Sequence, residues 1–519
     1  MKGEIEINCA IIRLAKGYKT RLSEKHWLIR LTNSSLVTSL GQTAGWSELV
    51  KKDLRSAVPV STNLEANNQE YSEAHEKLSP SPLQSTPANK LPQYAAAIIA
   101  TMGGFAMGTV LGWSAPAVEK IKEIVPLTKN DISWIGSIAN LGGALVMLPM
   151  AFILDRLGRR VTMLGLAPPL FGGWLLIALF SKVPIYIAGP VYNGEIAQKE
   201  IRGTLGVFYQ LFLCAGILFS YIVGYVADLT TLSCVCSAIP VLFFVAFYFM
   251  PETPLYLLMK NKREEAKKSL QWLRGKHYNI ESELNNLEDF VRETKMKNVK
   301  LKDVLKSRAA IRGLIISAGV MMCQQLSGIK AVVFYAVTIF KDAGSTLDPY
   351  ICTIIVGAVL TGATGLSAFV VDRFGRRRLL LMSHVCTTIC LASLGYYFYV
   401  KEHYPDQATG IGWLPLSSMC IYLITYTMGS GACSWVILGE IFPNEIKGMA
   451  SSFSAFVNWF LAFVVTVSFP YMVIDLGSAW AFWIFSMFSF LGLLFVWFCV
   501  IETKGKTLEE IQKELSKTK

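Results

Sequence analysis

Long apolar stretches of the sequence contain carboxamide side chains, among them Gln210, Gln324, Gln325 and Asn458. A carboxamide both donates and accepts hydrogen bonds, which suits it to bind hydroxyl groups that do the same. A polar group among apolar residues needs a partner, so these side chains are candidates for a functional site. For Gln210 alone, a hydrogen bond between two packed helices is the competing interpretation.

The elements that must position these amides are membrane-spanning helices. Hydrophobic residues make up 53% of the 519 residues, charged residues only 17%. A helix needs about 20 apolar residues to cross the ~30 Å hydrocarbon core, and the runs are continuous rather than alternating. The stretches long enough to cross are Tyr94–Trp113, Ile132–Leu154, Val161–Ser181, Thr204–Ala227, Leu229–Pro251, Gly313–Phe340, Pro349–Val371, Leu379–Val400, Thr409–Gly439, Gly448–Ile474 and Leu476–Ile501. We therefore expect an all-α membrane protein with about eleven full spans.

Two local features refine the candidate site. Gln324 and Gln325 precede Leu-Ser-Gly, which predicts a break in the helix, and discontinuous helices commonly build solute sites in membranes. Trp435 offers an apolar face with a polar tip, although an isolated tryptophan is more often a packing residue.

The sequence contains an internal repeat. DRLGRR at 155–160 recurs as DRFGRR at 372–377, and the Gly194–Gly203 motif recurs at Gly439–Gly448. Glu252-Thr253 recurs as Glu502-Thr503, in the same order along the chain. Three motifs repeated in order predict two homologous halves.

The repeat also predicts a gap in the first half. The interval from Asp155 to Gly194 is 39 residues, whereas the interval from Asp372 to Gly439 is 67. Two spans of about 20 residues cannot fit into the shorter interval. We expect the fourth helix to be largely missing, with the shortfall at residues 182–193.

The domain organisation follows from charge and hydropathy. We expect a disordered cytosolic tail at 1–92, an N-terminal bundle at 93–251, a linker at 252–312, a C-terminal bundle at 313–502 and a tail at 503–519. Apolar residues at helical spacing predict amphipathic helices in the linker and the C-terminal tail. The net charge of +12 lies mostly in loops, which indicates membrane orientation rather than nucleic-acid binding and places both termini in the cytosol.

The whole motif set resembles the sugar-porter branch of the major facilitator superfamily. It comprises DRLGRR, PVYNGEIAQKEIRG, PETP, QQLSGI, DRFGRR, GEIFPNEIKG and ETKGKTLEEI, and is most similar to insect facilitated trehalose transporters and, more distantly, facilitative glucose transporters. The resemblance implies two six-helix bundles in the plasma membrane, a sugar as the partner, alternating access and no cofactor. It also implies that sugar is contacted by Gln210, Gln324, Gln325, Trp435 and Asn458.

The resemblance assigns the charged motifs to a network of salt bridges between helices that holds the outward-facing state and breaks when the halves rock inward. Its expected members are Asp155, Arg156, Arg159, Arg160, Glu195, Arg202, Glu252, Asp372, Arg373, Arg376, Arg377, Glu440, Lys447 and Glu502. The competing interpretation is that these charges only set the topology. Single exposed pairs contribute about 0–1 kcal/mol, yet a network can bias a balanced equilibrium.

Departures from the family pattern bear on substrate and mechanism. Lys330 stands where the family has asparagine after QQLSGI, so we expect altered specificity, because a cation near the middle of the membrane needs a partner. GSGACSW at 429–435 lacks the usual prolines. The first predicted span has no carboxylate, which favours facilitated diffusion over proton symport.

Two functions remain open from the sequence. One is a facilitative carrier for trehalose or a hexose. The other is a non-transporting relative, such as a sensor, a splice variant or a gene-model product, because of Lys330 and the short fourth span. A membrane enzyme is disfavoured, because the spans contain no nucleophile–base pair and no metal-ligand cluster. The sequence does not give the oligomeric state.

Overall fold

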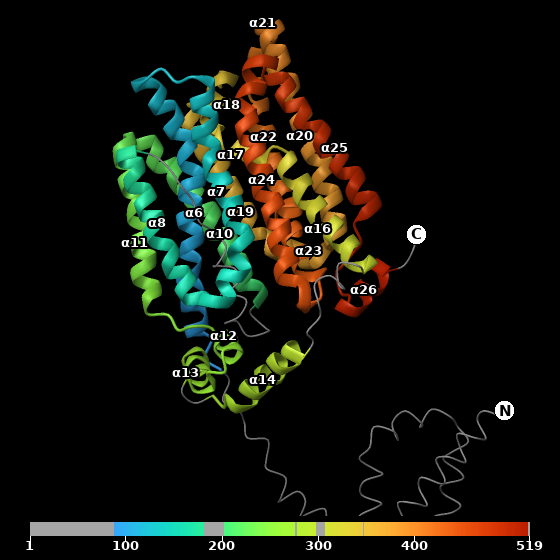
Figure 1. Ribbon diagram of the computed structural model, residues 1–519. Helices are drawn as coiled ribbons and strands as arrows, with labels where there is room; N and C mark the ends of the chain where they lie inside the picture. The colour runs from blue at the N-terminus through green and yellow to red at the C-terminus, as the bar shows by residue number, and fades with distance from the viewer. Residues whose placement is uncertain (1–87, 181–201, 276–277, 297–306, 346, 517–519) are drawn as a thin grey trace, which may run out of the picture. The chain divides into compact units, whose positions relative to one another are not determined.

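The computed structural model describes residues 88–180, 202–275, 278–296, 307–345 and 347–516 (Figure 1). Every regular element in these ranges is a helix. Almost all of the predicted N-terminal tail lies outside them. The predicted shortfall in the fourth helix, at residues 182–193, also lies outside the described residues.

The helices follow one another in two sets with a linker between them. The first half contains α6 (Leu91–Ile124), α7 (Lys129–Leu157), α8 (Arg159–Phe180), α10 (Arg202–Val226) and α11 (Leu229–Tyr248). The linker contains α12 (Pro254–Met259), α13 (Arg263–Arg274) and α14 (Glu281–Met296). The second half contains α16 (Arg308–Leu326), α17 (Ile329–Phe334), α18 (Ala336–Ala343), α19 (Pro349–Phe374), α20 (Arg376–His403), α21 (Pro405–Gly410), α22 (Leu414–Tyr426), the π-helix η1 (Thr427–Gly431), α23 (Ala432–Glu440), α24 (Asn444–Leu476) and α25 (Ser478–Cys499), and α26 (Leu508–Ser516) follows in the tail.

Nine helices within the described residues are long and apolar enough to cross a membrane. They include α16 with α17 as one span and α22 to α23 as another. Helices α7 and α8 are not among the nine but coincide with two further predicted spans. The all-helical membrane class is therefore confirmed, while the number of about eleven spans stays a prediction.

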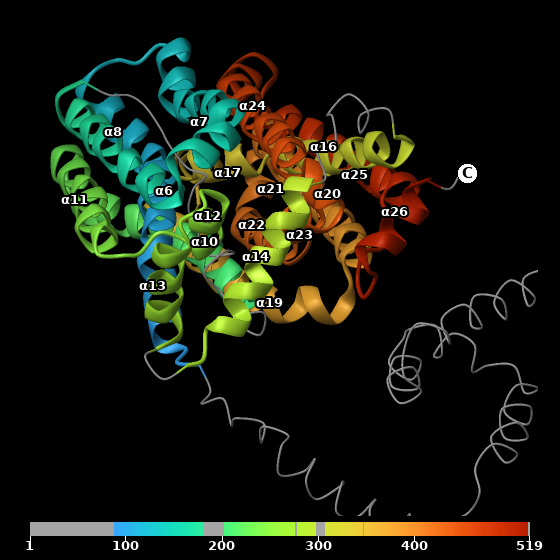
Figure 2. The same cartoon turned by 60° about the horizontal axis from the view of Figure 1, so that its bottom comes forward.

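The two halves repeat one packing pattern. In the first half α6 packs on α10 and α8 on α11; in the second, α16 packs on α24 and α20 on α25. The contact between the halves is repeated too, because α7 packs on α24 and α10 packs on α19. Figures 1 and 2 both show α7 beside α24. This arrangement is what two homologous halves would give.

The helix ends near the linker, which we call the linker end, are distinct from those at the opposite end. Figure 1 shows α12 to α14 below the first-half helices. The amide of Asn89 donates to the carbonyl of Arg274 at 2.8 Å, so α6 begins beside α13. Helix α6 therefore ends, and α7 begins, at the opposite end. The predicted amphipathic helices are confirmed: Leu270 of α13 and Leu515 of α26 are buried.

The prediction that the first span ends at Trp113 was wrong. Helix α6 continues through Pro116 to Ile124 and includes Glu119. A proline is tolerated inside a membrane helix when neighbouring helices satisfy the freed backbone. The ring of Pro116 packs against Gly224 of α10, so the neighbouring helix supports the α6 backbone at this point.

A stripe of glycines on α6 lets two backbones touch. Gly104, Gly108 and Gly112 repeat every four residues and so lie on one helix face. A Cβ atom on Gly108 would overlap the carbonyl oxygen of Leu213 on α10. Small residues at this spacing allow close packing of membrane helices, where dispersion replaces the hydrophobic effect as the attraction.

We expect Gly108→Ala to loosen the α6–α10 contact. Because backbone atoms cannot move aside as a flexible side chain does, overpacking of this kind costs about 1–3 kcal/mol. The melting temperature in detergent should fall, measured by fluorescence-detected size exclusion after heating. Gly165→Ala on α8 is the matched control, because no atom of the described residues lies within 4 Å of its Cβ position. Equal melting temperatures for the two variants would contradict the prediction.

Candidate functional site

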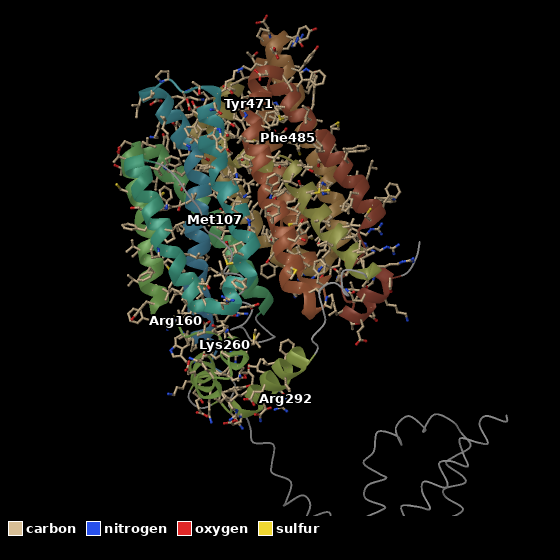
Figure 3. The ribbon with its side chains drawn as sticks, in the orientation of Figure 1. Met107, Arg160, Lys260, Arg292, Tyr471 and Phe485 are labelled. Atoms are coloured by element: carbon tan, nitrogen blue, oxygen red, sulfur yellow. The ribbon has the colours of Figure 1, made fainter. Side chains whose placement is uncertain are left out.

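The break after the paired glutamines is present as the sequence predicts. Helix α16 ends at Leu326, and Gly328 has φ +82°, the left-handed region that favours glycine, before α17 begins. A Cβ on Gly328 would lie 2.7 Å from the ring of Phe485 on α25, the residue labelled in Figure 3. Tyr422 on α22 donates to the freed carbonyl of Ser327 at 3.1 Å. The break is therefore held in place by two neighbouring helices.

Gln324, Gln325 and Asn458 form one hydrogen-bonded group, which we call the amide cluster. Asn458 Nδ2 donates to Gln324 Oε1 at 2.7 Å, and Gln325 Nε2 donates to Asn458 Oδ1 at 3.0 Å. All three are buried, at 2–3% exposure. Gln325 Oε1 has no hydrogen-bond partner among the described residues. The cluster thus holds a buried acceptor that a ligand hydroxyl would satisfy.

The remaining donor of Gln324 reaches a π-helical turn. Its Nε2 donates to the carbonyls of Ser430 and Gly431 in η1, at 3.1 and 3.2 Å. A π-turn leaves carbonyls of the ordinary helix ladder available, and such turns are frequent at functional sites. In this stretch the α-helical hydrogen-bond pattern is therefore interrupted by a π-turn, while the helix itself continues from α22 into α23. The sequence offers Gly429 and Gly431 as the signal, but it does not specify a π-turn.

Neither Gln210 nor Trp435 has a described contact with the amide cluster. Gln210 Nε2 lies 3.7 Å from Cys214 Sγ, one turn along α10, and this thiol lies 3.3 Å from Thr364 Oγ1 on α19. These contacts join the two halves. Trp435 on α23 is 42% exposed, and no described contact links it to the cluster. The roles of Gln210 and Trp435 stay predictions.

Lys330 is the one residue of α17 that is not buried. Its Nζ lies 5.0 Å from the centre of the Trp459 ring, a cation–π contact that the sequence reasoning missed although Trp459 follows Asn458 directly. A lysine at the membrane centre costs about 2.5–3.5 kcal/mol on insertion scales, and a cation–π contact returns about 0.5–2 kcal/mol. The described contacts therefore compensate Lys330 only in part.

At the linker end of the first half, one carboxylate caps a helix. Glu252 accepts hydrogen bonds from the backbone amides of Arg159 and Arg160, at 3.0–3.1 Å, at the start of α8. A carboxylate is favourable there because the first amides of a helix lack partners and carry partial positive charge. The guanidinium of Arg160, labelled in Figure 3, donates to the carbonyl of Tyr248 at the end of α11, at 2.6 Å.

The second half contains an equivalent carboxylate cap. Glu502 accepts from the amides of Arg376 and Arg377 at 2.9 and 3.1 Å, at the start of α20. Arg377 donates to the carbonyl of Trp497 at the end of α25, at 2.7 Å. Arg376 also pairs with Glu440 at 3.0 Å. The repeated motifs thus join the start of one helix to the end of another in each half, α8 to α11 in the first and α20 to α25 in the second.

Other predicted members of the network have weaker contacts or cannot be placed. Asp155 is 65% exposed at its side chain and lies 3.9 Å from Arg159. Arg156 lies over the ring of Phe152, and Arg373 is exposed. Lys447 stands at the start of α24, partly buried. The side chains of Arg202 and Asp372 and the whole of Glu195 lie outside the described residues. The conformational role of the network stays a prediction.

The pKa values of the two capping carboxylates, Glu252 and Glu502, shift in opposite directions. Burial raises the pKa of Glu252 despite its backbone hydrogen bonds. Burial also raises that of Glu502, but hydrogen bonds from Lys504, Arg376, Arg377 and Thr503 outweigh it, so its pKa is lowered. Relative to the unfolded chain, the fold therefore disfavours ionisation of Glu252 and favours ionisation of Glu502.

We expect Glu502→Gln to lower the melting temperature in detergent more than Glu252→Gln does. At Glu502 the neutral isostere removes a charge that the fold stabilises relative to the unfolded chain, whereas at Glu252 it removes a charge that burial disfavours. The stability contributed by Glu502 is present above the pKa of the unfolded chain and is lost as the pH falls through the lowered pKa. Melting curves at neutral pH and near pH 4 check both statements. A larger loss for Glu252→Gln at neutral pH would contradict them.

Hydrogen bonds join the two halves at the opposite end. Glu119 of α6 is 2% exposed and accepts from Thr338 of α18 at 2.7 Å. It also pairs with Lys341 of α18 at 2.8 Å and with Lys122 at 2.6 Å. Lys129 of α7 pairs with Asp475 of α24 in an exposed position. Tyr471 of α24, labelled in Figure 3, donates to Asn130.

A family model and several known proteins match most of the chain. A family model described as "Sugar (and other) transporter" matches residues 93–515. A facilitated trehalose transporter, Tret1, of Polypedilum vanderplanki is 38% identical, over 82% of this chain and 88% of that protein. The Tret1 protein of Bombyx mori is 36% identical, over 90% of this chain and 96% of that one.

A solved structure is similar as well. It is the proton:xylose symporter XylE of the major facilitator superfamily, bound to 6-bromo-6-deoxy-D-glucose. The TM-score is 0.67 at 26% sequence identity, and the match covers 82% of this chain and all of that one. The major facilitator fold expected from the motifs is supported by this likeness.

Proposed function

Because the chain belongs to the sugar transporter family of the major facilitator superfamily, we propose that it carries trehalose or a hexose across the membrane by facilitated diffusion. The membrane class and the family are established by the helices and the matches above. The sugar, the absence of ion coupling and the transport cycle belong to the proposal.

The observation that carries the proposal is the amide cluster. Its members satisfy one another except for Gln325 Oε1, which faces no described donor. A buried acceptor without a partner costs about 1–3 kcal/mol. A sugar hydroxyl that donated to this oxygen would recover part of that cost. The cluster therefore favours binding of a hydroxyl-rich ligand.

Uniport is favoured over proton symport by the position of the carboxylates. No Asp or Glu occurs between Leu91 and Val118 of α6. Glu119 follows, but it pairs with Lys122 and Lys341 near the end of the helix. A carboxylate held by two cations is poorly suited to exchange protons in each cycle, because both cations favour the charged form.

We propose that the linker end faces the cytosol and that the halves rock about a central site. Basic residues at the linker end support this orientation. The bonds of Glu119, Lys129 and Tyr471 between the halves lie at the opposite end. In this orientation the described arrangement is closed toward the outside. Rocking would break these bonds while the clamps within each half stay intact.

Uptake of radiolabelled trehalose and D-glucose into oocytes tests the proposal. We expect saturable uptake above that of water-injected cells, unchanged between external pH 6 and 8, with surface biotinylation to normalise expression. No uptake by a surface-expressed protein would favour the non-transporting alternative. Uptake that rises steeply as the external pH falls would instead indicate proton symport.

A further inference from the structure

We propose that the central site takes an anionic sugar, a hydroxyl-rich ring that bears one carboxylate, and that Lys330 is the specificity-determining residue that pairs with this carboxylate. The inference rests on the proposed function only in that it uses the same site. It names the chemical class of the ligand that fits there.

Lys330 has no counter-ion among the described residues. It forms no ion pair in the part of the chain that the structure describes, and its described contact is with the Trp459 ring. The sequence contains no Asp or Glu from Arg308 to Lys341 or from Ile446 to Ile474. The helices that carry Lys330 and Trp459 therefore supply no carboxylate near mid-span. A lysine that lacks a protein anion in the membrane favours an anion brought by the ligand.

Lys330 and its aromatic partner stand next to members of the amide cluster along the chain. Its partner Trp459 follows Asn458 directly in α24, and Asn458 bonds to both glutamines. Lys330 itself is five residues after Gln325, across the break at Gly328. The cation and the hydroxyl-binding amides thus lie on the same pair of helix segments. One ligand could contact both groups.

The position of Lys330 is fixed by a buried aromatic ring. Trp459 is buried and its ring packs on Gly143 of α7, where a Cβ would lie 3.0 Å from the ring. The ring is therefore held between the two halves while Lys330 lies over it. From this position the lysine would hold a ligand carboxylate as a point charge.

Charge balance favours a carboxylate over a phosphate. One ammonium neutralises one negative charge. A sugar phosphate carries about −1.5 to −2 at neutral pH, so it would leave negative charge uncompensated in an apolar setting. The carboxylate of a hexuronate carries a single charge. We therefore take D-glucuronate as the probe.

Ligand-induced thermal stabilisation of the full chain in detergent tests binding without requiring transport. We expect millimolar D-glucuronate to raise the melting temperature of the wild type more than equal D-glucose does. Lys330→Asn should lose the response to glucuronate and gain one to glucose, so that the ratio of the two apparent affinities shifts at least tenfold. Lys330→Arg, which keeps the charge, should retain the preference for glucuronate. D-Galacturonate and D-glucose 6-phosphate test whether the carboxylate and its single charge are what is recognised.

The outcomes separate this inference from the proposed function. Glucuronate binding without uptake of any sugar by surface-expressed protein would overturn the transport proposal and leave the inference intact. Uptake of neutral sugars with no competition by glucuronate would overturn the inference alone. Equal responses of wild type and Lys330→Asn to both sugars would also overturn it. A stronger response to glucose 6-phosphate than to glucuronate would contradict the single-charge argument.

Discussion

Asn458→Ala is expected to reduce sugar uptake, normalised to surface protein, by roughly 10- to 100-fold. Asn458 satisfies both glutamines, since it donates to Gln324 Oε1 and accepts from Gln325 Nε2. Its loss leaves two buried polar groups without their partners, at about 1–3 kcal/mol each. Initial rates over a range of sugar concentrations would show whether the loss lies in KM, as expected for misplaced binding groups, or in the maximal rate.

Ser454→Ala is the matched control for that variant. Ser454 lies one turn earlier on α24 and shares a buried hydrogen bond with Ser317 of α16, at 3.0 Å. Its replacement removes a similar contact between the same two helices but leaves the amide cluster complete. We expect a small fall in melting temperature and nearly normal KM. Equal losses of uptake in the two variants would mean that helix packing, not the cluster, explains the effect.

Glu119→Gln is expected to shift the carrier toward the state that is open at the opposite end. The neutral side chain keeps one acceptor but loses both charge-assisted bonds to Lys122 and Lys341. Breaking a buried pair costs about 3–5 kcal/mol, and we expect about 2 kcal/mol here because Lys341 is 58% exposed. That is roughly a 30-fold change in the ratio of the two states. The external KM for uptake should fall and the internal KM for efflux should rise.

Lys129→Ala provides the comparison for Glu119→Gln. The Lys129–Asp475 pair also joins the halves at this end, but both side chains are about half exposed. Exposed pairs contribute about 0–1 kcal/mol, so the ratio of external to internal KM should change by no more than a few fold. A larger shift for Lys129→Ala than for Glu119→Gln would contradict the assignment of the buried pair as the main contact.

The sequence predicts the features that depend on local pattern. The break at Gly328 follows from Leu-Ser-Gly after the glutamines, and the twin motifs at Arg159 and Arg376 predict equivalent helix ends. The glycine stripe of α6 is a local signal of the same kind, because glycines at every fourth position in an apolar segment favour close helix packing. These features depend on residues close together in the chain, so a single sequence can carry them.

The features that the sequence does not give depend on partners far apart in the chain. The pair of Glu119 with Lys341 requires α6 to continue past Pro116, which depends on packing against α10. The π-turn at Ser430 is held by Ser383 of α20, whose hydroxyl accepts from the Ser430 amide at 3.2 Å. The contact of Lys330 with Trp459 likewise joins segments more than a hundred residues apart. Only the assembled fold brings these groups together.

The two carboxylate caps also indicate whether the halves need to be covalently connected. Glu252 clamps α8 and α11 entirely within the first half, and Tyr256 and Ser269 fasten α12 and α13 to the same half. Glu502 does the same for α20 and α25 in the second. The helix ends of each half are therefore joined by hydrogen bonds within that half. None of these bonds depends on the peptide connection between residues 296 and 307. Two co-expressed polypeptides divided there would each retain the capping and arginine hydrogen bonds of its own half. The protein can therefore be regarded as a heterodimer of two halves joined by a peptide linker.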